Sequence, residues 1–453
     1  MNPNIFREYD IRGEADKDLT DDVTKCVGKA FGAHAQSLGK KNVTLARDCR
    51  LSSPRLHKAM LEGMLSTGLD VVDIGICPTP AFYFSLFHLD KEGGVHITGS
   101  HNPADQNGFK VCIGKGTIHG EEIQKLRQIC EEGRYIEGQG SLSEYEIIPV
   151  YQDYIAENIK LDRPLKVIID AGNGTAGPVA PEIMRRLGCE VEELYCEMDG
   201  AFPNHHPDPT VPKYLEEIID RTKSGGYDCG IAYDGDADRL GVIDDKGNIL
   251  WGDQLLTLFA REILERKPGS VIISEVKSSK TLFEDIARHG GEPIMWKTGH
   301  SLIKEKMKET DAAVAGEMSG HIFFNDRYLG FDDAIYSSCR LLEILSRSKK
   351  PLSEMLDDVP KMYSTPEIRV ECPEEIKFKA VAEITEHFKS GGYDVVDIDG
   401  ARVTFDDGWG LIRASNTQPV LVLRFEGASE KRRDEIRRLI EGKLDEVLKK
   451  SGA

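Results

Sequence analysis

An apolar strand, a polar turn, a helix that ends at glycine and a second strand follow one another three times along the chain. This order is typical of a parallel-type α/β layer. The copies lie about 100–120 residues apart, far more than the period of a solenoid, so we predict three similar domains. The predicted strand, helix and strand cover residues 42–47, 53–68 and 69–75; 165–170, 178–188 and 189–195; and 269–275, 281–291 and 292–297.

The last part of the chain has a different pattern. Two long helical stretches, 374–389 and 430–450, flank a run of short strands, which indicates an α+β domain with helices on one side of a sheet. We therefore expect an α/β protein of four domains, the fourth being smaller, each contributing a loop to a common central cleft. The predicted domains are 1–145, 146–248, 249–360 and 361–453.

Composition narrows the class of protein. The chain has 453 residues, 40% of them hydrophobic, and a net charge of −19. This negative charge disfavours binding to nucleic acid or to anionic membranes, and no apolar run approaches the ~18 residues of a membrane span. The first residues are charged and lack the apolar core of a secretory signal, and no cysteine belongs to a C-x-x-C pair. We expect a cytoplasmic protein with free thiols.

The first stretch with candidate chemistry is residues 96–110, where a short apolar strand opens into Gly99-Ser100-His101-Asn102-Pro103. Glycine permits a close backbone approach, and proline fixes the turn. A serine on such a loop can be a nucleophile if a base and cations are near. The same residues also form ordinary turns, so the pattern alone leaves both interpretations open.

The second stretch is Tyr233–Gly241, in which Asp234, Asp236 and Asp238 alternate with small residues. Three carboxylates so close together repel one another unless a cation lies among them, and all-oxygen ligands select Mg²⁺ or Ca²⁺. An EF-hand is not indicated, because position 239 is arginine where glycine is required and the flanks are strands. A solvated acidic turn remains the alternative.

Two more polar loops follow predicted strands. In residues 315–321, Glu317 and Ser319 could hydrogen-bond sugar hydroxyls and His321 lies beside them, although most such loops are merely surface. Residues 413–419 combine a guanidinium fork with hydroxyl, amide and backbone donors, which is typical of a phosphate-binding loop. Its donors are Arg413, Ser415, Asn416 and Thr417.

Further positive charge is available near the N-terminus. Residues 6–13 contain Arg7, Tyr9 and Arg12, and for Arg47, Asp48 and Arg50 we predict an internal salt-bridge network. Residues 172–177 match the G-x-G-x-x-G pattern of dinucleotide-binding proteins. A dehydrogenase would leave the aspartate triplet, Ser100 and the 413–419 loop unexplained, so we favour a packing role for these glycines.

Taken together, TGSHNP, DGDADR, GEMSGH and RASNTQP occur in this order, one per predicted domain. The chain resembles, from end to end, the α-D-phosphohexomutase superfamily, specifically the bacterial phosphomannomutase/phosphoglucomutase type. The resemblance implies four domains, the first three with a shared α/β core. It also implies that Ser100 is a phosphoserine and that Asp234, Asp236 and Asp238 hold Mg²⁺ together with its phosphate.

The same resemblance implies the substrate contacts. Glu317 and Ser319 would bind sugar hydroxyls, and the 413–419 loop would hold the non-reacting phosphate. The matching positions that would complete the cleft are Tyr9, Arg12, Lys110, Arg239, Lys277, His300 and His321. The Glu-Met-Ser-Gly-His loop is similar to the version that accepts both mannose and glucose.

The expected activity is that of a phosphohexomutase, an intramolecular phosphotransferase that interconverts hexose 1- and 6-phosphates. Hexose 1,6-bisphosphate would be its intermediate and activator. Arg12, Lys110 and Arg239 would neutralise charge on the transferring group, and Lys110 or His101 would take the hydroxyl proton. The expected partners are small sugar phosphates, with the protein a monomer or weak homo-oligomer. A phosphatase or serine hydrolase, a dehydrogenase and a non-catalytic sugar-phosphate binding protein are the rival interpretations.

Overall fold

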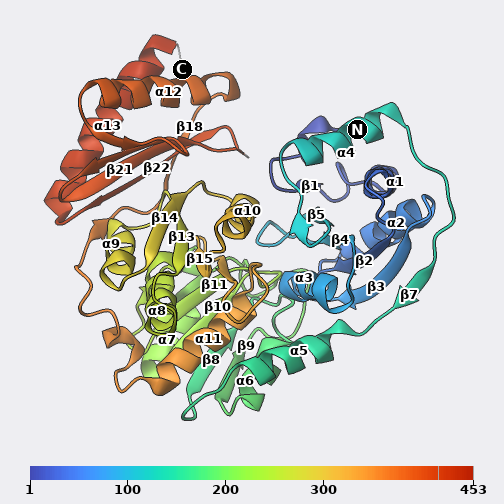
Figure 1. The fold of residues 1–453 in the computed structure, drawn as a ribbon, viewed down its shortest axis with the longest axis horizontal. Coiled ribbons are helices and arrows are strands. Elements are labelled where there is room, and N and C mark those ends of the chain that lie inside the picture. Colours follow the sequence, from blue (N-terminus) through green and yellow to red (C-terminus); the bar gives the residue numbers. More distant parts are fainter. Residues whose placement is uncertain (417, 452–453) are drawn as a thin grey trace.

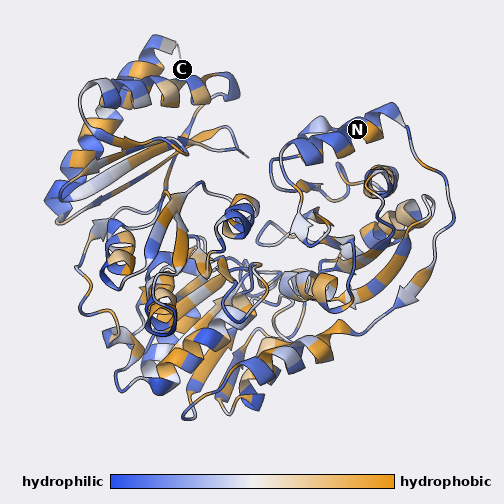
Figure 2. Cartoon of the chain, in the orientation of Figure 1, coloured by the Kyte–Doolittle hydropathy of each residue, from blue (hydrophilic) through white to orange (hydrophobic). Residues whose placement is uncertain are grey.

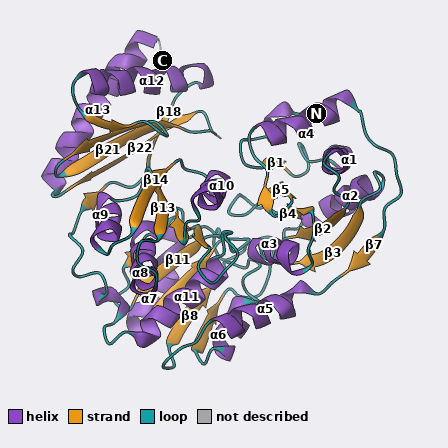
Figure 3. Ribbon diagram, viewed as in Figure 1, coloured by secondary structure: helices purple, strands orange, loops and turns teal. Residues whose placement is uncertain are grey.

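The computed structural model describes residues 1–416 and 418–451, and within them the chain forms four successive sheets with flanking helices (Figures 1 and 3). Apolar residues gather on the strands and on the inner faces of the helices (Figure 2). The predicted α/β fold with a smaller α+β domain at the C-terminal end is confirmed. Short 3₁₀ helices cover Pro3–Ile5, Pro212–Leu215 and Leu352–Glu354.

The first sheet has the strand order β1-β5-β4-β2-β3-β7, with β6 paired to β5. Helix α1 begins where Thr20 accepts a hydrogen bond from the Val23 backbone, and two aspartates in its first turn favour the positive end of the helix dipole. The elements are β1 (Ile11–Glu14), α1 (Asp21–Ser37), β2 (Asn42–Arg47), α2 (Ser53–Leu65), β3 (Asp70–Ile76), α3 (Thr79–His88), β4 (Gly93–Ile97), β5 (Gln106–Ile113), β6 (Gly116–Thr117), α4 (Glu121–Glu132) and β7 (Leu142–Glu144).

The second and third sheets have the orders β12-β11-β10-β8-β9 and β14-β13-β15-β16. The second set comprises α5 (Ile147–Asn158), β8 (Lys166–Asp170), α6 (Ala180–Arg186), β9 (Glu190–Leu194), α7 (Glu216–Gly225), β10 (Cys229–Tyr233), β11 (Leu240–Asp244) and β12 (Ile249–Leu250). The third set comprises α8 (Gly252–Arg266), β13 (Val271–Glu275), α9 (Lys280–Arg288), β14 (Glu292–Trp296), α10 (His300–Thr310), β15 (Val314–Gly316), β16 (Ile322–Phe324) and α11 (Ala334–Arg347).

The last sheet is antiparallel, in the order β17-β22-β21-β20-β19 with β18 paired to β22, and α12 and α13 lie together on one side of it (Figure 1). Its elements are β17 (Tyr363–Ser364), β18 (Ile368–Glu371), α12 (Glu374–Ser390), β19 (Asp394–Val396), β20 (Ala401–Phe405), β21 (Gly408–Ala414), β22 (Val420–Gly427) and α13 (Glu430–Ser451).

The three predicted strand–helix–strand units are confirmed as β2-α2-β3, β8-α6-β9 and β13-α9-β14, each with its two strands paired in parallel. The sheets also contain antiparallel neighbours, namely β4 with β5, β10 with β11, and β15 with β16. Each of the four motif loops joins two consecutive antiparallel strands, the last pair being β21 and β22. The sheet therefore fixes both ends of every loop that carries candidate chemistry.

The hydrophobic core consists of separate clusters of unequal extent. One continuous cluster runs from Ala46 and α3 of the first domain through the second and third sheets to Leu352. The last domain has a separate core between its sheet and α12 and α13. A small cluster of Val276, Trp409 and Leu411 joins it to the third domain. The first three domains thus share packing that the last domain does not.

Candidate active site

Ser100 lies in the loop between β4 and β5 and is 3% exposed. Its backbone adopts a left-handed conformation with φ of 48°, which is uncommon for a residue with a side chain and indicates a locally enforced geometry. The Ser100 Oγ donates a hydrogen bond to Oδ2 of Asp234 at 2.7 Å and lies 3.0 Å from Nδ1 of His101. The loop therefore aims the hydroxyl at the acidic turn of the second domain.

The acidic turn joins β10 to β11 and places three buried carboxylates together. One ligand atom from each of Asp234, Asp236 and Asp238 lies within 4.8 Å of the others. Among the described residues, Oδ1 of Asp236 has no hydrogen-bond donor, and the group facing Oδ1 of Asp238 is the His321 ring, with Nε2 at 3.3 Å. Buried carboxylate oxygens without donors suit a hard divalent cation, so this triad is able to hold a metal ion.

Burial and mutual repulsion strongly shift the pKa values of these carboxylates. Burial raises the pKa of Asp234 well above its usual value, and the charges of Asp238 and Asp236 add to the rise. For Asp238 the burial penalty is outweighed by Lys110 and His321, so its pKa lies well below the usual value. A bound dication would favour the charged form of all three groups.

Lys110, on β5, reaches the same carboxylates. Its Nζ lies 2.9 Å from Oδ2 of Asp236 and makes a close contact with Asp238. Burial lowers the pKa of Lys110, but Asp236 and Asp238 reverse that effect and raise it above its usual value. Burial instead lowers the pKa of His101 well below its usual range, helped by Arg239 and Arg12. Lys110 is therefore a fixed positive charge, and His101 is neutral and able to accept a proton.

The two candidate arginines flank the Ser100 loop and the acidic turn. Arg12, on β1, donates to Oδ1 of Asn102 in the Ser100 loop at 2.8 Å and to Asp10 at 2.6 Å. Arg239 follows the acidic turn, and its Nε lies 3.4 Å from Nε2 of His321. Both guanidinium groups thus lie beside the residues that would handle a phosphoryl group.

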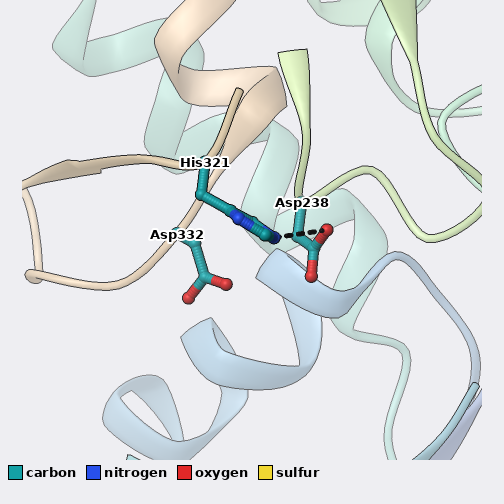
Figure 4. A group of neighbouring side chains, drawn as sticks. All are labelled: Asp238, His321 and Asp332. Carbon is teal, nitrogen blue, oxygen red and sulfur yellow. Dashed lines mark ion pairs between the residues drawn. The ribbon is translucent and has the colours of Figure 1, made fainter. Parts of the chain in front are cut away.

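The loop between β15 and β16 contacts the acidic turn through His321. The His321 ring points to Asp238, with Nε2 3.3 Å from Oδ1, and Asp332 lies beside the pair (Figure 4). On its other side, Nδ1 of His321 lies 3.0 Å from Glu317 and 2.9 Å from Oγ of Ser319. Burial lowers the pKa of His321, but Asp238 and Glu317 outweigh it and raise the pKa to about 9.

Asp238, His321 and Asp332 form a second group with ligand atoms within 4.8 Å of one another. Cationic groups already face it, because Lys304 contacts Asp332 at 2.9 Å and His321 is protonated at neutral pH. The aspartate triad also faces a cation, Lys110, but its ligand atoms are all oxygens, so it is the better candidate site for a hard metal ion.

Two contacts of α10 extend this network toward the N-terminal residues. The His300 ring lies 5.6 Å from that of His321 and 6.1 Å from that of Tyr9, measured between ring centroids. The Tyr9 hydroxyl donates to the Thr298 carbonyl at 3.0 Å and accepts from Nδ2 of Asn416 at 3.2 Å. Tyr9 thus joins the first, third and last domains at one point.

The β21–β22 loop is fixed by its own domain. Arg413 is buried and donates from Nε to Oδ2 of Asp399 at 3.0 Å. The Ser415 backbone donates to the Val420 carbonyl at 3.0 Å, and its Oγ accepts from the Gln418 backbone at 3.2 Å. Thr417, which the sequence also assigns to this loop, lies outside the described residues.

Lys277 follows β13 and is buried beside Glu275 at 3.5 Å and Glu367 at 3.2 Å. Arginines of the last sheet hold the backbone around it. Arg424 donates to the Lys277 carbonyl at 2.7 Å, and Arg402 donates to the carbonyl of Ser278, also at 2.7 Å. The last domain therefore binds the backbone of the loop that carries Lys277.

Sequence analysis missed several residues that shape the site. Thr79 and Thr98 donate to Oδ2 of Asp236 at 2.6 and 3.2 Å. Thr98 opens the TGSHNP motif but was given no role, and no motif marks Thr79. Of the network predicted for Arg47, Asp48 and Arg50, the Asp48–Arg50 ion pair is present at 3.3 Å, whereas Arg47 forms no ion pair with the described residues. The binding of Arg50 to the Ser100 loop was not foreseen. The D-x-R spacing of Asp48 and Arg50 directly after a strand was the available signal.

The glycine run 172–177 packs against the acidic turn. A Cβ at Gly174 would lie 2.7 Å from the Gly235 carbonyl, and the Thr175 backbone donates to that same carbonyl at 3.1 Å. The predicted packing role is confirmed, because the close approach of two backbones requires glycine here.

Comparison with known proteins agrees with this arrangement. Family models for phosphoglucomutase/phosphomannomutase match the chain in order: alpha/beta/alpha domain I at residues 3–137, domain II at 149–247, domain III at 251–363 and the C-terminal domain at 367–443. The chain belongs to this family.

Relatives in the phosphoglucomutase/phosphomannomutase family are similar along nearly the whole chain. The phosphomannomutase/phosphoglucomutase of Pseudomonas aeruginosa is 45% identical over 98% of this chain and 96% of that protein. The phosphoglucomutase of Neisseria gonorrhoeae is 48% identical over 94% of both chains. A crystal structure of a family protein from Burkholderia thailandensis superposes with a TM-score of 0.92 at 44% identity, covering 99% of this chain and 98% of that one.

Within the part of the chain that the structure describes, no helix combines the length and apolar character that crossing a bilayer requires.

Proposed function

We propose that the protein is a phosphohexomutase that interconverts the 1- and 6-phosphates of mannose and glucose. The observation that carries the proposal is the hydrogen bond between the buried Ser100 Oγ and Asp234, which places a nucleophile against a carboxylate triad. Family membership and the names of the full-length relatives support the same reaction class.

Mg²⁺ is the proposed metal, held by Asp234, Asp236 and Asp238 together with the phosphate on Ser100. The buried triad, in which Oδ1 of Asp236 has no donor among the described residues, supports this ligand set. The bound ion would supply charge neutralisation for the transferring phosphoryl group.

In the proposed reaction, phosphoserine Ser100 transfers its phosphoryl group to the free hydroxyl of a hexose 1- or 6-phosphate. The bond between phosphorus and the serine oxygen breaks, a bond to the sugar oxygen forms, the hydroxyl proton moves to a base, and the released serine oxygen takes up a proton to become the Ser100 hydroxyl again. The neutral His101 ring supports a role for this residue as that base, whereas Lys110 acts as a fixed charge with Arg12 and Arg239. The resulting hexose 1,6-bisphosphate reorients within the site and returns its other phosphoryl group to Ser100.

Substrate binding is proposed for the remaining candidates. Glu317 and Ser319 would bind sugar hydroxyls, and the β21–β22 loop would hold the non-reacting phosphate through Arg413, Ser415, Asn416 and Thr417. Tyr9, Lys277, His300 and His321 would line the space between them. The contacts that connect Tyr9, His300 and His321 support a common site.

The proposal assigns one task to each predicted domain around a central cleft. Residues 1–145 carry the phosphoserine, 146–248 the metal ligands, 249–360 the sugar-binding loop and 361–453 the phosphate-binding loop. A cytoplasmic location and a monomer or weak homo-oligomer remain predictions from the sequence.

Phosphorus NMR tests the proposal directly. We expect purified protein with Mg²⁺ and a trace of hexose 1,6-bisphosphate to convert mannose 1-phosphate and glucose 1-phosphate into the 6-phosphates. Removal of the metal with a chelator should stop the conversion. Growth of inorganic phosphate instead would indicate a phosphatase, and unchanged spectra with both sugars would contradict the proposal.

Ser100→Ala provides the matching variant, because it removes the proposed phosphoryl carrier. Turnover should fall by about 10⁴-fold or more, while binding of the hexose phosphate stays measurable by calorimetry. Ser85→Ala is the control, since this buried serine on α3 of the same domain bonds only to helix backbone at Phe82 at 2.6 Å and to Thr44 at 3.5 Å. Equal turnover in the two variants would exclude the phosphoserine role.

A further inference from the structure

A buried arginine supports the Ser100 loop from beneath. Arg50 is 1% exposed, and its guanidinium donates to four backbone carbonyls of this loop. One terminal nitrogen binds the carbonyls of Ser100 and Asn102, each at 2.7 Å. The other binds those of Pro103 at 2.6 Å and Gln106 at 3.0 Å. A single side chain thus gathers the carbonyls on both sides of the turn.

This arrangement requires the shape of arginine and not only its charge. The planar guanidinium presents five N–H donors in a rigid fork, whereas a lysine ammonium presents three donors on one atom. Lysine at position 50 could not reach all four carbonyls, and those left buried without a donor would destabilise the turn.

Asp48 holds the other side of the same turn. Its Oδ2 accepts a hydrogen bond from the Gly99 backbone at 3.1 Å and lies 3.3 Å from Nε of Arg50. A Cβ at Gly99 would lie 2.5 Å from that Nε, so the residue before Ser100 must be glycine for the guanidinium to fit. Hydrogen bonds therefore hold the backbone on both sides of the Ser100 side chain, at the Gly99 N–H and at the Ser100 carbonyl.

Arg50 also lies where the first domain meets the second. Its backbone forms an isolated bridge with Gly200, and its guanidinium carbon lies 5.0 Å from the centre of the Phe202 ring. On the far side of the Ser100 carbonyl, a Cβ at Gly235 of the acidic turn would approach to 2.5 Å. The Ser100 peptide is thus enclosed between Arg50 and the turn that carries Asp234.

From these contacts we infer that Arg50 is a positioning residue for phosphoryl transfer: it holds Ser100 in its left-handed conformation, with Oγ directed at Asp234, without touching the substrate. The inference rests on the proposed role of Ser100. A misplacement of about 1 Å between reacting groups can cost about 10²-fold in rate, so loss of this support should appear in turnover.

The test compares Arg50→Lys with wild type in steady-state assays and in titration of Ser100 by labelled hexose 1,6-bisphosphate. We expect kcat to fall by about 10²-fold, KM to stay within about threefold, and labelling at Ser100 to remain stoichiometric but slower. Arg55→Lys is the matched control, because Arg55 also binds backbone carbonyls of the first domain, but those of Ala15 and Leu19 instead of carbonyls of the loop. It should change kcat by less than about twofold.

Specific outcomes would overturn the inference. Folded Arg50→Lys with turnover near wild type would do so, as would a reduced number of labelled sites that each turn over normally, since that result indicates only a structural role. Arg50→Ala should regain part of its activity on addition of guanidinium ion but not of methylammonium, and equal rescue by both ions would count against a role for the fork.

If Arg50→Lys does not fold, Asp48→Asn decides the question. It keeps an acceptor for the Gly99 backbone but removes the charge opposite Arg50, so kcat should fall by about tenfold with full labelling. Unchanged kcat would contradict the inference. Failure of wild-type protein to become labelled at Ser100 would instead refute the proposed function, which keeps the two results separate.

Discussion

The loops that carry Ser100 and Arg413 both lie between antiparallel strands, yet they are held in different ways. The Ser100 loop is bonded by Arg50 and Asp48, and its domain is joined to the second domain by a hydrophobic cluster that includes α3, in addition to having a core of its own. The Arg413 loop belongs to a domain with its own core, and it meets the first domain through the Asn416–Tyr9 hydrogen bond.

This difference matches the tasks proposed for the two loops. A reacting group has to be placed to within a fraction of an ångström, because misalignment is costly in rate. A loop that holds the non-reacting phosphate must let the bisphosphate reorient, so it benefits from a domain that can move. We therefore expect changes near Ser100 to lower kcat and changes in the last domain to act mainly on binding.

The largest effect is expected for Asp234→Asn, which removes the carboxylate that accepts the Ser100 hydrogen bond. We predict a fall in kcat of about 10³-fold with a much smaller change in KM, measured by a coupled steady-state assay. Asp245→Asn is the control, because this nearby carboxylate bonds to Ser353 outside the site. A kcat within tenfold of wild type would contradict the expectation that changes near Ser100 act on kcat.

Arg413→Lys should have the next largest effect, and chiefly on binding. The variant loses the Nε bond to Asp399 and the fork that can bind phosphate through two donors. Loss of about 1.5–3 kcal/mol in a charged hydrogen bond predicts a KM about 10–100-fold higher. Arg432→Lys, which loses a comparable Nε bond to Asp407 on the same domain, should retain its KM.

Tyr9→Phe removes only the hydroxyl that connects the first, third and last domains. Loss of one or two neutral hydrogen bonds, about 1 kcal/mol, predicts a five- to tenfold lower kcat/KM. Tyr145→Phe, whose hydroxyl contacts His88 at the surface, serves as the control. If the two variants have equal kcat/KM, the Tyr9 hydroxyl does not contribute to bringing the domains together.

The smallest expected effect concerns acid stability at the junction of the last two domains. Burial alone would raise the pKa of Glu367, but Lys277 and Arg369 outweigh it and lower the pKa to about 2. The charged carboxylate therefore stabilises the fold above its usual pKa of 4.5, and this contribution is lost as pH falls from 4.5 toward 2. The carboxylate is near the surface, so screening limits the contribution to about 1 kcal/mol.

Urea unfolding of wild type and Glu367→Gln at several pH values checks this point. The variant should be less stable near neutral pH, and the difference should shrink as the pH is lowered from 4.5. Glu371→Gln, at an exposed position of β18, should show no such convergence. A constant difference at all pH values would mean that the Lys277–Glu367 ion pair does not fasten the last domain.

Much of this architecture could be predicted from the sequence. The parallel units were visible because an apolar strand, a helix ending at glycine and a second strand leave a periodic pattern. The pairing of β1 with β5 was harder to predict, since β1 is short and pairs Ile11 with the distant Phe109. Local pattern carries no information on such pairing.

The candidate site could likewise be predicted only in part. The aspartate triplet was visible because three clustered carboxylates repel one another unless a cation lies among them, whereas Ser100 was assigned its role only by the family resemblance. The roles of Thr79 and Thr98 and the binding of Arg50 to loop carbonyls were not predicted. Threonines and arginines are common, and their partners are set by tertiary structure. Residues that support a reacting group are thus less visible than those that take part in the reaction.

The hydrogen bond between Tyr9 and Asn416 joins residues 407 positions apart. At a synthesis rate of about 10 residues per second, a ribosome would make the first of these residues roughly 40 s before the second. The Ser100 loop and the acidic turn can pack together while the last domain is still being translated, but Tyr9 has no Asn416 until residue 416 has been added. A chain that stops early would therefore carry a formed nucleophile and metal site without the phosphate-binding loop.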